Sequence, residues 1–404
     1  MTHTNLSIAM IGTRGVPARY GGFETAVEEV GRRLADKGHH VRVYCRRREE
    51  KDHPTSYLGM ELVTLPAARK RSLETLSHTA LSVGHLLRHR VDAAFVFNAA
   101  NSPLLPPIRA ARIPVATHVD GLEWKRGKWG PTGKKYYRVA EALAVRWSDA
   151  LIADAEGIAD YYQHEFQAAS DLISYGAPIV TPGSDRLGEL DLTERGYHLV
   201  VARFEPENRV DRIVEGYSKS SAKRPLIVVG SAPYSDEYTA LIHEKADKRR
   251  VRFLGGVWDQ ELLNQLYANC LTYVHGHSVG GTNPSLLRAM GAGAPCLARG
   301  VVFNREVLGD AGIFGEGVAD VAARIEEAEA DVDGTVQRGE ACRQRARDYN
   351  WGDVASRYED LARRLAQSGP RRDRPSGRRT GLGTRLVSEQ ESEPSLGQSS
   401  LKVG

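Results

Sequence analysis

Short apolar runs alternate with helical patterns along most of this chain, and this alternation limits the fold more than any other feature of the sequence. Residues 6–11 and 41–45 are apolar runs with the length of a buried strand. Between them, residues 23–37 have an apolar stripe at helical spacing: Phe23, Ala26, Val27, Val30 and Leu34. A strand, a helix and a second strand in this order predict a parallel βαβ unit.

The alternation falls into two series. The first continues with strands predicted at 93–97, 114–119 and 150–153, and the second has strands predicted at 198–202, 226–229, 251–254, 271–274 and 296–298. The sequence therefore predicts an α/β fold of two Rossmann-like, doubly wound parallel-sheet domains that face a central cleft, where open α/β folds bind their ligands.

The domain limits follow from composition. Residues 179–196 are rich in Pro, Gly, Ser, Asp and Glu without periodicity, which predicts a linker between an N-terminal domain at 1–178 and a C-terminal domain at 197–350. We expect a closing helix at 351–368. The tail 369–404 is rich in Arg, Ser, Gly and Pro and poor in aromatic residues, so we expect it to be disordered.

The net charge of +4 gives no general argument for nucleic-acid binding, because the tail alone has seven basic and four acidic residues and the rest is nearly neutral. The four cysteines form no C-x-x-C pair, which argues against a zinc site or a disulfide framework and fits a reducing cytoplasm. No segment has the apolar length of a membrane span, so we expect any membrane contact to be peripheral.

A glycine-rich loop at residues 12–24 follows the first predicted strand and opens the first predicted helix. Its glycines, Gly21 and Gly22 among them, would let an anion or a sugar approach the backbone at the helix start. The spacing matches neither the dinucleotide fingerprint nor a P-loop. A tight turn without a ligand explains these glycines equally well.

A second loop, before residue 283, is more informative. Asn283 is a favourable N-cap and Pro284 a favourable first helical residue, so a helix should begin here, and its free N–H groups would suit a phosphate or diphosphate. A well-capped structural helix explains the cap but not the two glycines and two histidines before it: His275, His277, Gly280 and Gly281.

Two predicted strands end in polar residues. The strand at 114–119 leads to His118 and Asp120, an imidazole and a carboxylate at the carboxyl edge of the first sheet, which are site candidates. The strand at 198–202 leads to Arg203 at the carboxyl edge of the second sheet, where a salt bridge with a neighbouring glutamate is the alternative role.

Four segments together resemble the GT-B retaining glycosyltransferases of family 4, and more narrowly the rhamnosyltransferase-like branch of bacterial polysaccharide assembly enzymes: residues 12–25, 119–126, 202–208 and 279–287. The resemblance implies a GT-B fold. It also implies transfer of a sugar, with retention of its anomeric configuration, from a nucleotide diphosphate donor to a saccharide or lipid-diphosphate-linked acceptor.

The resemblance also implies residue roles. His118 and Asp120 would be the catalytic pair facing the sugar, and Arg203 would grip the diphosphate. The other implied donor-binding residues are Gly21, Gly22, Asn208, Arg209, His277, Gly280, Gly281, Thr282, Asn283 and Arg288. The implied front-face attack, in which a leaving-group phosphate oxygen takes the acceptor proton, needs positioning and charge stabilisation more than a base. We therefore expect no metal and no cofactor.

Two departures from the family pattern concern the donor site. Gly280 and Arg288 stand where the wider family has two glutamates, and Asn208 stands at the family's lysine, so that Arg209 or Arg288 would have to supply the phosphate-binding charge. These losses leave a second hypothesis open, a catalytically silent sugar-nucleotide-binding subunit of a glycosyltransferase complex. A nicotinamide-dependent oxidoreductase is disfavoured, because the dinucleotide fingerprint is missing.

Basic clusters in the N-terminal half and a helix predicted at 73–90, with leucines among basic residues, suit an anionic membrane surface, although a packed surface helix explains them too. With a lipid-linked acceptor in view, we expect a cytoplasmic protein at the inner face of the cell membrane. Rhamnose or another hexose is the expected sugar, by resemblance alone.

Overall fold

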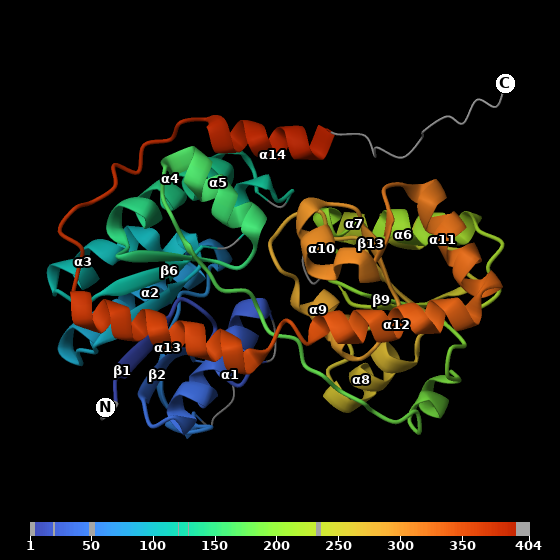
Figure 1. The fold of residues 1–404 in the computed structure, drawn as a ribbon, viewed down its shortest axis with the longest axis horizontal. Helices are drawn as coiled ribbons and strands as arrows, with labels where there is room; N and C mark the ends of the chain where they lie inside the picture. Colours follow the sequence, from blue (N-terminus) through green and yellow to red (C-terminus); the bar gives the residue numbers. More distant parts are fainter. Residues whose placement is uncertain are drawn as a thin grey trace.

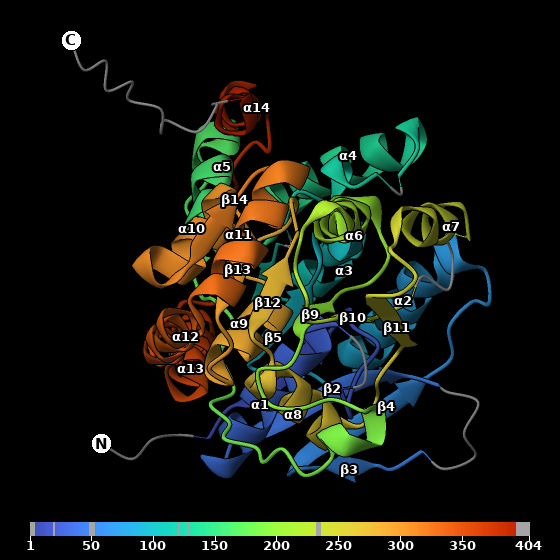
Figure 2. The ribbon, with the colours of Figure 1, turned by 90° about the vertical axis from the view of Figure 1, so that its right-hand side faces the viewer.

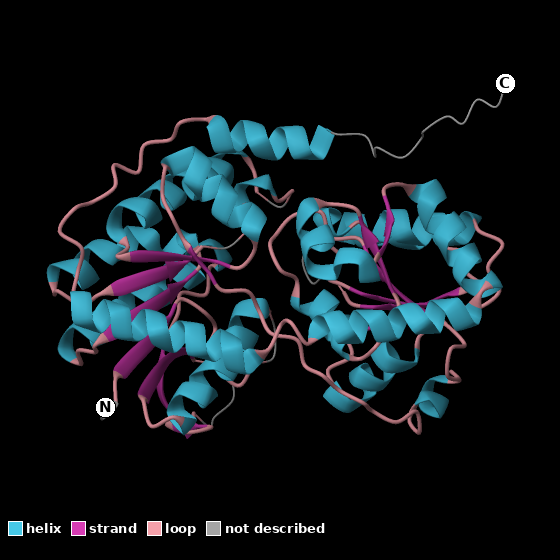
Figure 3. Ribbon diagram, in the orientation of Figure 1, coloured by secondary structure: helices cyan, strands magenta, loops and turns pink. Residues whose placement is uncertain are grey.

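The computed structural model describes residues 5–18, 21–47, 53–119, 121–127, 129–231 and 236–392, except for the side chains of residues 71, 72 and 389–392. Two α/β domains lie side by side, and each has a sheet flanked by helices (Figure 1 and Figure 3). This arrangement confirms the predicted class of two doubly wound domains.

The N-terminal domain is built on one sheet, whose strands are β1 (Ser7–Ile11), β2 (His40–Arg46), β3 (Ser56–Tyr57), β4 (Met60–Leu65), β5 (Ala93–Phe97), β6 (Val115–His118), β7 (Ala150–Ala153) and β8 (Asp171–Leu172). Their order is β3-β4-β2-β1-β5-β6-β7-β8, and among the described strands only β3 and β4 pair antiparallel. The central strand β5 is buried along its whole length, as expected of a parallel sheet covered on both faces.

The helices of this domain are α1 (Gly22–Asp36), α2 (Arg71–Arg88), α3 (Leu105–Ala110), α4 (Pro131–Trp147) and α5 (Glu156–Phe166), with short 3-10 turns η1 (Ala99–Leu104) and η2 (Glu123–Lys125). Side chains of α2 and α3 pack in one cluster on the sheet, whereas those of α1 pack in another. The predicted stripe of α1 is the part that faces the sheet, since Ala26, Val27, Val30 and Leu34 are all buried.

The C-terminal domain has a second parallel sheet, in the order β11-β10-β9-β12-β13-β14, with strands β9 (His198–Val201), β10 (Leu226–Val229), β11 (Val251–Gly255), β12 (Thr272–His275), β13 (Cys296–Arg299) and β14 (Ile313–Gly315). Its helices are α6 (Val210–Lys219), α7 (Asp236–Lys245), α8 (Gln260–Asn269), α9 (Pro284–Gly291), α10 (Val302–Leu308), α11 (Val318–Ala330) and α12 (Val332–Ala346), and its 3-10 turns are η4 (Pro206–Asn208) and η5 (Gly309–Ala311). The segment between the two sheets contains η3 (Leu187–Leu190).

A long helix, α13 (Trp351–Ser368), returns from the C-terminal domain and packs against α1 and β5 of the N-terminal domain (Figure 1), and Figure 2 shows this helix end-on beside α12. Lys37 Nζ lies 2.7 Å from a carboxylate oxygen of Glu359 on this helix, and Tyr358 of the same helix reaches into the N-terminal core. The chain thus crosses between the domains twice, and both domains share one apolar cluster.

The segment after α13 is packed on the N-terminal domain, so the prediction of a disordered tail is wrong for residues 369–392. It runs along the domain to α14 (Leu382–Ser392), which lies on α5 (Figure 1). The buried side chains of Glu141 and Glu165 attract it, because Arg379 donates to an oxygen of each at 2.9 Å. Residues 393–404 lie outside the described residues.

Candidate functional site

Loops at the carboxyl ends of both sheets meet between the two domains. The loops after β1, β6 and β7 come from one side, and those after β9 and β12 come from the other. The hydroxyl of Thr282 donates to the carbonyl of Asp154 at 2.6 Å, and the backbone N–H of Glu156 donates to Glu306 at 2.8 Å across the same interface. This is the place where open α/β folds bind ligands.

The helix start at α9 is as predicted. The side chain of Asn283 accepts a hydrogen bond from the backbone N–H of Ser285 at 3.0 Å, and Pro284 is the first helical residue. Pro284 lies beside Gly22, where an added Cβ would come within 2.9 Å of the proline ring. The N-termini of α1 and α9 therefore meet across the interface, and both present the positive ends of their helix dipoles there.

The glycines of the second loop have packing reasons of their own. Gly280 has a φ of 138°, which disfavours a side chain, and a side chain on Gly281 would collide with the carboxylate of Asp154. Gly121 comes so close to Gly280 that a Cβ added to Gly121 would lie 2.5 Å from the Cα of Gly280. The glycines thus let the loops of the two domains touch at backbone distance.

Two histidines of this loop are stacked and uncharged. The rings of His275 and His277 lie 4.2 Å apart at 8°, and His275 is buried whereas His277 is half-buried. Burial lowers the pKa of His275 to about 3 and holds the pKa of His277 well below its usual value. Repulsion from the positive charges of Arg203 and Arg126 lowers the pKa of His277 further. Among the described residues, no protein atom pairs with Nδ1 of His277, so this neutral ring has a hydrogen-bonding atom to offer.

Arginines and glutamates from both domains form a cluster next to these rings. Arg203 is 45% exposed and lies 3.3 Å from Glu205, which confirms that the neighbouring glutamate is its partner here. Arg126, from the loop after β6, lies 3.9 Å from Glu205 and 3.8 Å from Glu207, and it also pairs with Glu123. Glu205 thus lies between an arginine of each domain.

Asn208, Arg209 and Arg288 have structural roles in this conformation. Asn208 is buried and donates to the carbonyl of Arg203 at 2.9 Å, and Arg209 has a φ of 53° where the turn leads into α6. The guanidinium of Arg288 is held by α8, donating to Asn264 at 2.6 and 2.9 Å and to Gln260 at 2.8 Å. The guanidinium of Arg288 is therefore occupied in this conformation, whereas the role of Arg209 as a phosphate ligand stays a prediction.

The predicted catalytic pair is only partly described. His118 is buried, and its Nδ1 lies 2.8 Å from the hydroxyl of Tyr358 on α13, while the ring edge meets Phe23. Burial lowers the pKa of His118 to about 3, so the ring is neutral. Within the described part of the chain, its Nε2 pairs with no protein atom. Asp120 lies outside the described residues. Gly21 is the N-cap of α1, with a φ of 104°.

The sequence interpretation missed Arg126, Asp154 and Glu207, which the structure brings to this site. Asp154 directly follows the predicted strand 150–153 and Arg126 follows the strand 114–119, so their place at a carboxyl sheet edge was the available signal. The place of Glu207 in the site could be seen only in the folded structure, because its carboxylate meets Arg126 across the interface between the domains.

Among the residues that the structure describes, no group of three His, Cys, Asp or Glu side chains is arranged as metal ligands would be. In the same ranges, no helix combines the length and the apolar character that crossing a membrane requires.

Comparison with known proteins agrees with this geometry. Residues 21–175 match the family model of the glycosyl transferase 4-like domain, and residues 189–348 match that of glycosyl transferases group 1. A curated relative, O-antigen chain mannosyltransferase B of Escherichia coli, is 28% identical over 135 residues. That match spans 32% of this chain and only 35% of the relative.

Solved structures share the whole arrangement. Sucrose-phosphate synthase from Thermosynechococcus elongatus superposes with a TM-score of 0.77 at 19% identity, covering 90% of this chain and 99% of that one. Anabaena Alr3699/HepE in complex with UDP-glucose superposes with a TM-score of 0.71 at 16% identity, covering 89% and 100%. With both domain families matched in order on this shared fold, the chain belongs to the glycosyltransferases of the GT-B fold.

Proposed function

We propose that this protein transfers a hexose from a nucleotide diphosphate sugar to a saccharide or lipid-linked acceptor during synthesis of a cell-surface polysaccharide. The observation that carries the proposal is the meeting of the N-termini of α1 and α9, at Gly22 and Pro284, at the interface where Arg126 and Arg203 also meet around Glu205. Two dipole ends and two guanidinium groups in one interdomain site favour a diphosphate.

The donor is bound mainly by the C-terminal domain in this proposal. The diphosphate lies at the N–H groups of residues 280–283, with Arg203 on its other side. Arg126 leaves Glu205 and Glu207 to reach the same phosphates from the N-terminal domain, which couples donor binding to the contact between domains. Neutral His277 donates or accepts one hydrogen bond without adding charge.

The proposed reaction retains the anomeric configuration. The bond between the anomeric carbon and a phosphate oxygen breaks, the acceptor oxygen bonds to the same face, and the acceptor proton passes to that phosphate oxygen. The sugar lies toward Gly21, His118 and Asp120, where Nε2 of His118 is the ring atom left for a sugar hydroxyl. Because arginines and helix amides stabilise the leaving diphosphate, we propose that the reaction needs no metal and no cofactor.

Turnover of a nucleotide-sugar panel tests the proposal. Purified, chelator-treated protein is incubated with UDP-glucose, GDP-mannose or dTDP-rhamnose and a lipid-linked acceptor, and the product anomer is identified by NMR. Rhamnose follows from the branch that the sequence resembles, whereas mannose is what the name of the Escherichia coli relative states. Transfer only after a divalent ion is added, or with inverted configuration, would refute the mechanism.

The silent-subunit hypothesis has one observation in its favour: the donors of Arg288 are occupied by Gln260 and Asn264, at a position where the resemblance implies a ligand for the nucleotide. Binding of a nucleotide sugar with neither hydrolysis nor transfer would favour it over the enzyme.

We also propose that the protein contacts an anionic membrane at its cytoplasmic face through the N-terminal domain. Leu73, Leu81 and Leu87 of α2 are 51%, 46% and 37% exposed among basic residues, as in helices that lie on a bilayer. Retention of the protein on anionic vesicles at low salt tests this contact.

A further inference from the structure

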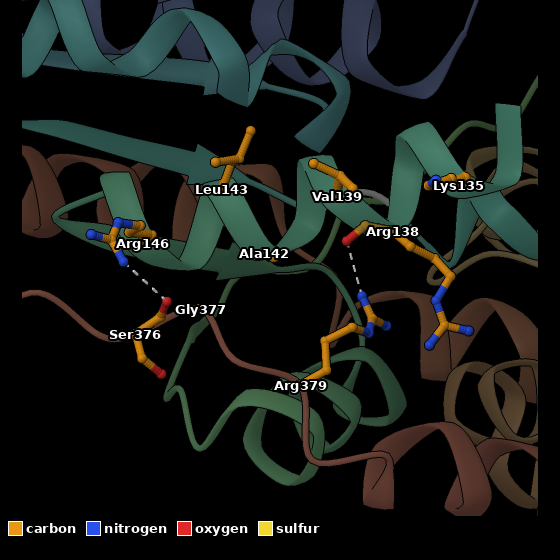
Figure 4. Close-up of a pocket in the computed structure, with 9 residues that line it drawn as sticks. All are labelled: Lys135, Arg138, Val139, Ala142, Leu143, Arg146, Ser376, Gly377 and Arg379. Carbon is orange, nitrogen blue, oxygen red and sulfur yellow. Dashed lines mark hydrogen bonds between the residues drawn. The ribbon is translucent and has the colours of Figure 1, made fainter. Parts of the chain in front are cut away.

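A hollow lies on the N-terminal domain, between α4 and residues 376–379, apart from the candidate donor site. It has a volume of about 480 Å³ (Figure 4). Within the described chain it is lined by side chains of two kinds. Val139, Ala142 and Leu143 are apolar, and Lys135, Arg138, Arg146 and Arg379 are cationic. No acidic side chain is among these lining residues.

The walls of the hollow are held in place by specific contacts, because the segment after α13 is packed against α4. Gly377 has a φ of 68°, and an added Cβ would lie 2.5 Å from the carbonyl oxygen of Ala142. On one side of this contact Arg146 donates to the carbonyl of Ser376 at 3.4 Å, and on the other Arg379 donates to the carbonyl of Arg138 at 3.0 Å (Figure 4).

The outer face of α4 has the pattern of a surface that meets lipid. Lys135, Val139, Ala142, Leu143 and Arg146 recur at helical spacing on one face, with apolar side chains between two exposed cations. Val139 in the middle of this face is 50% exposed. Long cationic side chains beside apolar ones can reach lipid headgroups while their stems stay on the apolar surface.

The surroundings extend this pattern. The ring of Trp147 at the end of α4 is stacked by two arginines, with Arg146 5.6 Å and Arg374 4.6 Å from its centre. The neighbouring helix α3 links α4 to α2, whose exposed leucines belong to the same helical layer. Tryptophan with basic residues is typical of protein surfaces at the bilayer interface.

Not all the cations are available to a ligand. Arg379 is already paired with Glu141 and Glu165, and Arg138 is less exposed than Lys135 and Arg146. Lys135 and Arg146 are exposed, and no ion pair to an acidic side chain is recorded for either within the described residues. These two are therefore the cations that a bound anion would engage first.

We propose that this hollow binds the phosphate headgroups of anionic phospholipids in the membrane, with Lys135 and Arg146 each on a phosphate at opposite ends of the hollow and with Val139 and Leu143 between them, against the upper part of the acyl chains. This deepens the proposed membrane contact, on which its role rests, and it adds a specific lipid site formed jointly by α4 and the C-terminal segment. Such a site would hold the N-terminal domain in a defined orientation on the membrane.

Vesicle co-sedimentation of the full chain tests the proposal, with phosphatidylcholine vesicles alone or mixed with phosphatidylglycerol. We expect binding only to the mixed vesicles. Lys135→Gln with Arg146→Gln should weaken it by about fivefold for each cation removed. The matched control is Lys248→Gln with Arg249→Gln, which removes the same charge from exposed positions of the C-terminal domain and should change binding by less than about twofold. Val139→Ser should weaken binding without any change of charge.

Three results would overturn the proposal. The first is equal weakening by the pocket pair and the control pair, which would mean a diffuse charge effect. The second is loss of binding in Leu81→Ser with Leu87→Ser but not in the pocket variants, which would assign the contact to α2 alone. The third is thermal stabilisation by inorganic phosphate that the pocket variants abolish, which would mean a free-phosphate site. Hydrolysis of the soluble donor, measured in parallel, reports on the proposed enzyme function separately.

Discussion

Replacement of Arg379 by alanine should destabilise the N-terminal domain, although this arginine lies beyond the last helix that the two family models cover. Its side chain donates to Glu141 and Glu165 at 2.9 Å each and to the carbonyl of Arg138 at 3.0 Å. The side chains of Glu141 and Glu165 are only 5% and 0% exposed, so water cannot replace the lost partner.

The expected loss is about 3–5 kcal/mol in the free energy of unfolding, which is typical when one partner of a buried ion pair is removed. Two hydrogen bonds to these carboxylates remain and limit the loss of stability. Tyr161 still donates to Glu141 at 3.0 Å, and the backbone N–H of Thr384 still donates to Glu165 at 3.0 Å. Glu141 can also take up a proton, because burial raises its pKa to about 7. The loss should therefore be larger above neutral pH than below it.

Urea titration followed by tryptophan fluorescence measures the effect, because the ring of Trp124 lies 6.5 Å from that of Tyr161, next to the affected carboxylates. Arg378→Ala is the matched control, since it removes the same charge from an exposed neighbour in the same segment. It should change stability by less than about 0.5 kcal/mol. If Arg379→Ala is as stable as Arg378→Ala, the C-terminal segment is not part of the N-terminal domain and this reasoning is refuted.

Three further predictions concern single groups. The folded state keeps a proton on Glu141 up to a pH of about 7, whereas the unfolded state loses it near the ordinary value of 4.5. The free energy of unfolding should therefore fall by up to about 3 kcal/mol as pH rises through this range, and Glu141→Gln should remove that slope in urea titrations. Identical pH profiles for the two proteins would contradict this. Gly281→Ala should collide with Asp154 and lower the melting temperature by the equivalent of about 1–3 kcal/mol, and Asp154→Ala in the same chain should restore it, as scanning fluorimetry can show. Arg126→Ala should lower kcat for transfer by about 10²-fold, as loss of a group that stabilises developing charge does, and an unchanged kcat in steady-state assays would exclude Arg126 from the reaction.

The two-domain fold was predictable because parallel strands buried on both faces leave continuous apolar runs, and amphipathic helices leave stripes, in the local sequence. The start of α9 was predictable for the same reason, since Asn283 and Pro284 act on their own backbone.

The packed C-terminal segment was not predictable from its composition. Its polar, glycine-rich sequence is typical of disorder when taken alone. What holds it are two carboxylates on α4 and α5, more than two hundred residues earlier, which need a cation only once these helices have buried them. The environment of His118 was hidden in the same way, because the tyrosine that binds its ring arrives with α13.

Titration calorimetry of nucleotides with chelator-treated protein tests the central claim most directly. The account predicts that a nucleoside diphosphate binds more tightly than the matching monophosphate without any metal ion. It also predicts that Arg203→Ala weakens binding of the diphosphate by about 10- to 100-fold, the worth of one charge-assisted hydrogen bond. Unchanged diphosphate affinity in Arg203→Ala, or binding that appears only after magnesium is added, would contradict the account.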